Sequence, residues 1–147
     1  MRRICVFAGA NVGVREEYRT AAEGLGRTIA GRQISLVYGG ARVGLMGAIA
    51  DAALAAHGHV TGVIPAALAD REVAHDGLSD LRIVASMHER KATMADLADG
   101  FIALPGGWGT LEEMFEILTI CSKPGQTGRR ITGWKLKRSS SSLPFYL

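Results

Sequence analysis

The sequence predicts an α/β fold in which helices cover both faces of a parallel sheet. Short, continuously apolar segments alternate along the chain with segments that have helical periodicity. Strands that are buried on both faces show this continuous apolar pattern, and strand–helix alternation favours right-handed parallel crossovers. No repeat with a period of about 20–50 residues is present, which excludes a solenoid.

Five strands and four main helices follow from this pattern, taken in chain order. The strands are expected at residues 2–9, 34–40, 59–65, 81–86 and 101–107, and most of them end in glycine or proline. The helices are expected at residues 16–33, 44–58 and 87–100, and from Thr110 onward. In the first helix, apolar residues recur at steps of three and four: Tyr18, Ala22, Leu25 and Ile29. Residues 66–80, which include His75, are polar and are expected to form a loop with a short helix.

Charge divides the chain into two parts. The chain has 147 residues, which suits one domain, and its net charge is +3. Residues 1–120 carry 11 basic and 14 acidic side chains, whereas residues 121–147 carry six basic ones and no acidic one. We therefore expect one domain over residues 1–120 and a basic, serine-rich tail over residues 121–147. The tail forms either one strand around residues 129–137 or no ordered structure.

Several classes of protein are excluded by composition. The basic charge lies in the tail, so residues 1–120 lack the basic face of a nucleic-acid-binding domain, and such binding would require the tail itself to be a binding arm. No apolar run approaches the length of a membrane span, and the N-terminal apolar run is too short for a signal peptide. Cys5 and Cys121 form neither a metal-binding spacing nor a disulfide framework. We expect a cytoplasmic protein without a metal or another cofactor.

Two glycine-rich loops, at residues 38–47 and 104–110, each follow a strand and open a helix. Such loops lie at the carboxyl ends of parallel strands, where helix N-termini bind anions. Neither loop is a Walker A motif, and either one alone is equally well explained by a tight turn. The turn after the first strand, residues 8–13, fits dinucleotide binding poorly, which disfavours the use of NAD.

Charged residues begin the two helices that follow the fourth and fifth strands. Ser86 and Glu89 have the spacing of a capping box, as do Thr110 and Glu113. Arg90 and Lys91 lie early in their helix, where cations oppose the helix dipole, so either an anionic ligand or solvation must favour them. Glu113 is either a cap for Thr110 or a catalytic carboxylate beside a phosphate site.

Three motifs together resemble those of the LONELY GUY (LOG) family of cytokinin riboside 5′-monophosphate phosphoribohydrolases. The motifs are "GGARVGLMG", "SMHERKATM" and "PGGWGTLEE", and the resemblance runs from about residue 3 to residue 120. It implies a Rossmann-like fold and a homodimer. It also implies hydrolysis of the N-glycosidic bond of N6-substituted AMP, and of AMP itself in some members. The products are the free base and ribose 5-phosphate, and no cofactor is required.

The resemblance implies a set of site residues. The catalytic pair falls on Arg90 and Glu113. The substrate-binding residues are Glu72, Arg90, Lys91, Gly106, Gly107, Trp108, Gly109, Thr110, Leu111, Glu112, Glu113 and Thr119. Within the loop, the amides of Gly107, Gly109 and Thr110 are expected to hold the 5′-phosphate. A second anion-binding loop is expected at Gly39, Gly40, Gly44, Met46 and Gly47.

The chain departs from the family pattern after Thr119. The family continues with a further strand and helices that close the sheet and contribute to the dimer, whereas here a basic, serine-rich sequence follows. The C-terminal part of the family fold is therefore expected to be missing or altered. This departure keeps open a non-catalytic nucleotide-binding module of the same fold. Lysine decarboxylation is rejected because Lys91, the one lysine before the tail, adjoins the catalytic arginine.

Overall fold

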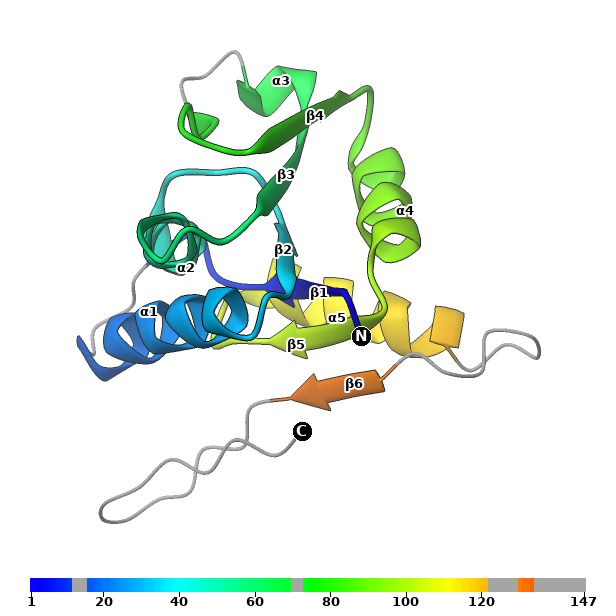
Figure 1. Ribbon diagram of the computed structural model, residues 1–147. Helices are drawn as coiled ribbons and strands as arrows, with labels where there is room; N and C mark the ends of the chain where they lie inside the picture. The colour runs from blue at the N-terminus through cyan, green and yellow to red at the C-terminus, as the bar shows by residue number, and fades with distance from the viewer. Residues whose placement is uncertain (12–15, 70–72, 122–129, 134–147) are drawn as a thin grey trace.

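A single six-stranded parallel sheet forms the centre of the molecule. The computed structural model describes residues 1–11, 16–69, 73–121 and 130–133 (Figure 1). The strands lie in the order β4-β3-β2-β1-β5-β6. Their bounds are β1 Arg3–Phe7, β2 Ser35–Tyr38, β3 Val60–Pro65, β4 Asp80–Val84, β5 Gly100–Ala103 and β6 Arg130–Gly133. All neighbouring strands pair in parallel, as the sequence predicts.

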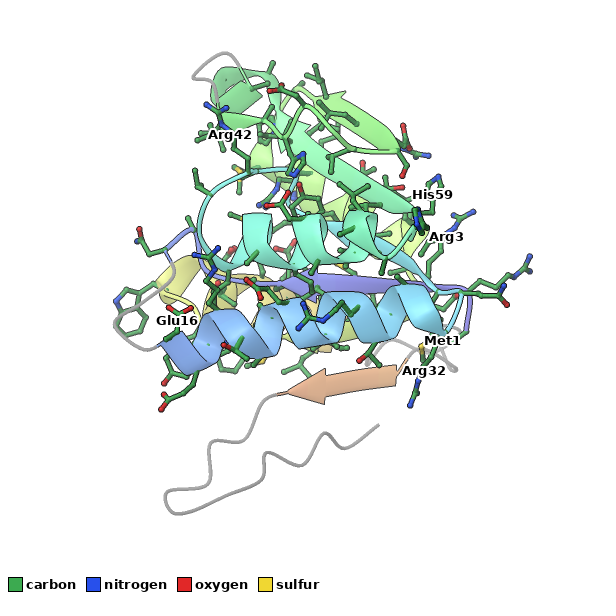
Figure 2. The ribbon with its side chains drawn as sticks, turned by 60° about the vertical axis from the view of Figure 1, so that its left-hand side comes forward. Met1, Arg3, Glu16, Arg32, Arg42 and His59 are labelled. Atoms are coloured by element: carbon green, nitrogen blue, oxygen red, sulfur yellow. The ribbon has the colours of Figure 1, made fainter. Side chains whose placement is uncertain are left out.

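Helices cover both faces of the sheet, which confirms the predicted Rossmann-like fold. The helices are α1 Glu16–Gly31, α2 Gly44–Ala55, α3 Ala66–Leu68, α4 Met87–Leu97 and α5 Trp108–Cys121. Helices α1 and α2 lie side by side on one face, as Figure 2 shows. They approach closely at Gly26, where an added Cβ atom would lie 2.4 Å from the carbonyl oxygen of Ile49. Helices α4 and α5 contribute to the core on the opposite face.

Alternate residues of each central strand enter two separate cores. In β1, Ile4 and Val6 pack with α1 and α2, whereas Cys5 and Phe7 pack with residues of α4 and α5. This division follows from the strand period of two, and it explains why the strand is apolar throughout. A parallel strand that is buried on both faces cannot present a polar residue to either side without a partner.

The sheet includes part of the predicted tail. Residues Arg130–Gly133 form β6 and pair with β5, in register from Gly100↔Arg130 to Ala103↔Gly133. Of the two alternatives for residues 129–137, the strand is confirmed at these four positions. The sheet therefore extends beyond the predicted 1–120 unit. None of the helices that the structure describes is long and apolar enough to cross a membrane, and a cytoplasmic location stays a prediction.

The strand order creates a switch point between β1 and β5. From β1, the chain adds β2, β3 and β4 toward one edge and then returns to place β5 on the other side of β1. The connections that leave β1 and β5 therefore diverge to opposite faces of the sheet. A crevice at the carboxyl ends of the two strands results, and this crevice is where ligands bind in open parallel sheets.

Candidate active site

A cavity of about 380 Å³ lies at this switch point. Its lining residues come from the turns after β1 and β5 and from the starts of α1 and α2: Gly9, Ala10, Asn11, Tyr18, Leu45, Pro105, Gly106 and Gly107. The turn after β1 lines this cavity, although its sequence fits dinucleotide binding poorly. A signal for it was available, since a first strand in this topology commonly borders the switch point.

Three turns are bonded together around the cavity. The Gly9 amide donates a hydrogen bond to the Pro105 carbonyl at 3.2 Å, and the Leu45 amide donates to the Gly9 carbonyl at 3.1 Å. A Cβ atom on Gly9 would lie 3.1 Å from the Cα atom of Gly106. On Gly44, whose φ is +64°, a Cβ atom would lie 2.3 Å from the backbone of Ala10. The glycines therefore permit a backbone approach that side chains would prevent.

Helix α5 begins two residues earlier than expected. It starts at Trp108, and the amides of Thr110 and Leu111 both donate hydrogen bonds to the Gly107 carbonyl, at 3.1 and 3.3 Å. The predicted capping box between Thr110 and Glu113 is therefore wrong, because Thr110 lies inside the helix. The amide of Thr110 already has an acceptor. The Gly109 amide lies in the first turn, where the helix itself provides no acceptor.

Arg90 and Glu113 form a buried ion pair between α4 and α5. The Nη1 atom of Arg90 donates a hydrogen bond to Oε1 of Glu113 at 2.7 Å, and its Nε atom donates to the Val63 carbonyl at 3.1 Å. Arg90 is 7% exposed and Glu113 is 8% exposed. Charged side chains are seldom buried to this extent unless they are paired. The carboxylate of Glu113 thus bonds a distant arginine in place of its own helix terminus.

The start of α4 places Arg90 at this position. The Ser86 hydroxyl accepts a hydrogen bond from the Glu89 amide at 3.1 Å, which confirms the predicted cap. The Glu89 carboxylate accepts from the Ala85 amide at 2.8 Å, one residue earlier than in a standard capping box. These bonds fix the first turn of α4, and Arg90 follows directly from it.

The Gly39 backbone bounds the guanidinium of Arg90 on another side. A Cβ atom on Gly39 would lie 2.0 Å from Nη2 of Arg90. Any residue larger than glycine would displace the guanidinium. Gly39 was predicted as part of an anion-binding loop, and the structure shows that it makes room for the arginine. Anion binding by Gly40, Gly44, Met46 and Gly47 stays a prediction.

Burial shapes the electrostatics of the pair. Burial raises the pKa of Glu113 above the ordinary glutamate value of 4.5, and the neighbouring Arg90 guanidinium opposes this increase. The pKa of the Cys5 thiol is also raised, first by its complete burial and then by the charge of Glu113. The Cys5 side chain therefore stays a neutral thiol. A glutamate with a raised pKa is a better proton acceptor than an exposed one, which suits general base catalysis.

Lys91 makes a second connection between α4 and α5. Its Nζ atom lies 2.6 Å from Oε1 of Glu112 and 2.5 Å from Oε2 of Glu116. The hydrogen bonds to Glu112 and Glu116 raise the pKa of Lys91. Lys91, which follows Arg90, and Glu112, which precedes Glu113, therefore form an ion pair with each other. Contact of Lys91 and Glu112 with substrate stays a prediction.

The other predicted site residues are distributed as follows. Glu72 lies outside the described residues. Trp108 and Leu111 are exposed at the start of α5, with 88% and 43% of their surface accessible. Thr119 donates a hydrogen bond from its hydroxyl to the Phe115 carbonyl at 3.0 Å. Thr119 lies six residues beyond Glu113, about 9 Å along the helix axis, so the structure does not bring it to the ion pair.

Together, the fold and the site define a Rossmann-like α/β protein that has a glycine-lined crevice and a buried Arg–Glu pair near the same strand ends. A family model described as "Possible lysine decarboxylase" matches residues 46–128. The chain is 56% identical over 119 residues to a cytokinin riboside 5′-monophosphate phosphoribohydrolase of Rhodococcoides fascians. It is 49% identical over 118 residues to the phosphoribohydrolase LOG3 of Arabidopsis thaliana. The chain belongs to the LOG family.

These matches cover only part of the relatives. They span 80% of this chain but 60% of the Rhodococcoides protein and 55% of the Arabidopsis protein. Among solved structures, the molybdenum cofactor carrier protein of Chlamydomonas reinhardtii has a TM-score of 0.73 at 20% identity, with 89% of each chain covered. The molybdenum cofactor binding protein of Rippkaea orientalis has a TM-score of 0.72 at 23% identity, with 91% of this chain and 77% of that chain covered. These two structures are similar in fold.

Removal of the Glu113 carboxylate is expected to destabilise the protein strongly. The substitution Glu113→Ala leaves the guanidinium of Arg90 buried without its counterion, which costs about 3–5 kcal/mol. Urea denaturation measures this loss in the free energy of unfolding. Glu112→Ala is the matched control, because the Glu112 side chain is 60% exposed. The exposed Lys91–Glu112 pair is expected to contribute about 0–1 kcal/mol to stability. Equal losses of unfolding free energy in the two variants would therefore contradict the burial of the Arg90–Glu113 pair.

Proposed function

We propose that the protein hydrolyses the N-glycosidic bond of cytokinin riboside 5′-monophosphates, with AMP as a further substrate. The observation that supports this most is the buried Arg90–Glu113 pair, because Glu113 lies on α5, the helix that opens at the glycine-lined crevice. The printed names of relatives that are about half identical to this chain agree with it. The products are the free base and ribose 5-phosphate.

The N-terminus of α5 is suited to the 5′-phosphate. The Gly109 amide lacks an acceptor within the helix, and the helix dipole places partial positive charge at this end. The adjoining cavity of about 380 Å³ is within the size range of small-molecule sites. Because Thr110 donates its amide to the Gly107 carbonyl, we assign the phosphate to the amides of Gly107 and Gly109.

Glu113 then faces the ribose and acts on water. As the C–N glycosidic bond breaks, its electron pair leaves with the base, and positive charge develops on the sugar ring. The Glu113 carboxylate stabilises this charge and accepts a proton from the attacking water, whose oxygen bonds to the sugar carbon. The proton finally resides on the released base. Arg90 holds Glu113 in place and presents a cationic group to the departing purine.

Chromatography of released base tests this proposal. Wild-type protein is expected to release base from isopentenyladenosine monophosphate or from AMP. Glu113→Gln keeps the size of the side chain and removes its basicity, so turnover should fall by about 100-fold or more, while calorimetry still detects nucleotide binding. Glu23→Gln, which alters a carboxylate on α1 that pairs with Arg19, should retain most of the activity.

Nucleotide binding by a folded wild-type protein that releases no base would overturn the hydrolase assignment. It would select a non-catalytic nucleotide-binding module of the same fold.

We further infer that two copies of the chain associate through α5. Trp108, Leu111 and Phe115 are 88%, 43% and 61% exposed, and their spacing places them along one side of the helix. A surface of this kind is self-complementary in a two-fold dimer, where the same patch meets its copy. The homodimer that the family resemblance implies is consistent with this surface, which adjoins the proposed phosphate site at Trp108.

A charge within this apolar surface is expected to dissociate the dimer. Phe115→Glu places a carboxylate at the centre of the interface, so sedimentation velocity should shift from a dimer toward a monomer. The matched control is Ile83→Glu on β4, because Ile83 is also 61% exposed but lies on another element. A wild-type protein that sediments as a monomer, or a Phe115→Glu variant that remains a dimer, would contradict the proposed interface.

A further inference from the structure

Residues 73–77 lie against the turn between β2 and α2. The His75 amide donates a hydrogen bond to the Gly40 carbonyl at 3.0 Å, and the Arg42 amide donates to the Val73 carbonyl at 2.9 Å. Between these two bonds, Ala41 and Ala74 form an antiparallel bridge. The backbone of the β2–α2 turn is therefore held on one side by a segment from a different part of the chain.

The side chain of His75 connects this segment to α2. Its Nε2 atom lies 2.8 Å from Oδ1 of Asp51, and the Gly77 amide donates a hydrogen bond to its Nδ1 atom at 3.1 Å. Because Nδ1 accepts, the ring proton lies on Nε2 and is donated to the Asp51 carboxylate. The His75 side chain is only 11% exposed, whereas that of Asp51 is 70% exposed. The imidazole thus uses both nitrogens to join its own loop to α2.

The position of this connection matters because the β2–α2 turn is next to Arg90. Gly40, the acceptor for the His75 amide, directly follows Gly39, whose backbone adjoins Nη2 of Arg90. Gly40 has a φ of +76°, so the turn adopts a conformation that only glycine adopts readily. A displacement of this turn would open a space beside the guanidinium. Among the residues that the structure describes, Val63 and Glu113 would then provide the remaining hydrogen bonds to the Arg90 side chain.

We propose that His75, through Asp51, is a positioning residue that holds the β2–α2 turn against the guanidinium of Arg90. The catalytic consequence rests on the proposed function, whereas the positioning of Arg90 does not depend on it. The sequence assigns no role to His75 itself. Its contribution follows from contacts among residues that are 24 and more positions apart.

Substitutions at His75 and Asp51 remove the His75–Asp51 contact and the Gly77–His75 contact separately. His75→Gln keeps an N–H donor that reaches Asp51 but loses the acceptor for Gly77. His75→Asn keeps an acceptor near Gly77 but is too short to reach Asp51, and His75→Ala loses both contacts. Asp51→Asn retains a carbonyl oxygen that accepts from neutral His75, so it serves as the conservative control for Asp51→Ala.

The first measurement is hydrogen exchange of the Arg90 Nε proton, observed by nitrogen-15 NMR. This proton is buried and bonded to Val63, so it is expected to exchange slowly in the wild-type protein. His75→Ala and Asp51→Ala should accelerate its exchange by about 10-fold or more, beyond any change in the β1 core amides, whereas Asp51→Asn should not. An unchanged rate, or an increase equal to that of the core amides, would overturn the positioning role.

The second measurement is the kinetics of base release. A misplaced Arg90 should lower kcat by about 10- to 100-fold, because small displacements of positioned groups have effects of this size. KM should change by no more than about two-fold, since the phosphate amides of α5 are not part of the connection. A KM increase with unchanged kcat would overturn the assignment. Wild-type protein that releases no base, yet shows the Arg90 exchange effect, would reject the proposed function and retain the positioning role.

Discussion

Arg90 and Glu113 face each other in a part of the molecule from which water is largely excluded, and the arrangement of the surrounding elements follows from this pair. Two isolated charges would not persist there, because the desolvation of each costs several kcal/mol. Their mutual hydrogen bond, and the bond from Arg90 to the Val63 carbonyl, provide the compensation. Helix α4 must therefore present an arginine, and α5 a glutamate, where the two side chains can meet.

Glycine is required at three positions near the ion pair and the cavity. Gly39 leaves room for the guanidinium, and Gly9 and Gly44 allow three strand–helix turns to pack closely around the cavity. The same crowding positions the first turn of α5, whose amides we assign to the phosphate. The amides that we assign to the phosphate and the carboxylate of Glu113 thus lie on one helix, about a turn apart. In the proposed function, binding of the phosphate therefore places the ribose beside the carboxylate.

Local patterns in the sequence were sufficient for the elements of the fold, whereas Arg90 and Glu113 were identified as a pair through the family resemblance. Strand–helix alternation and apolar periodicity predict the sheet, and Ser86 caps α4 as its spacing predicts. Interactions between distant segments were not predictable in this way. The Thr110–Glu113 spacing imitates a capping box, but Arg90, 23 residues away, binds the carboxylate more favourably than the helix terminus does. The turn after β1 and the contacts of His75 likewise depend on strand order and on long-range packing.

The central claim is that burial prepares Glu113 as a base while Arg90 keeps it in place. The most direct measurement is the pH titration of the Glu113 side-chain carboxyl by carbon-13 NMR, with Glu113→Gln to assign the signal. Since burial outweighs the opposing effect of Arg90, the carboxyl should titrate with a pKa above 4.5. A pKa at or below 4.5 would mean that the arginine dominates, and it would contradict the role of Glu113 as a base prepared by its buried position.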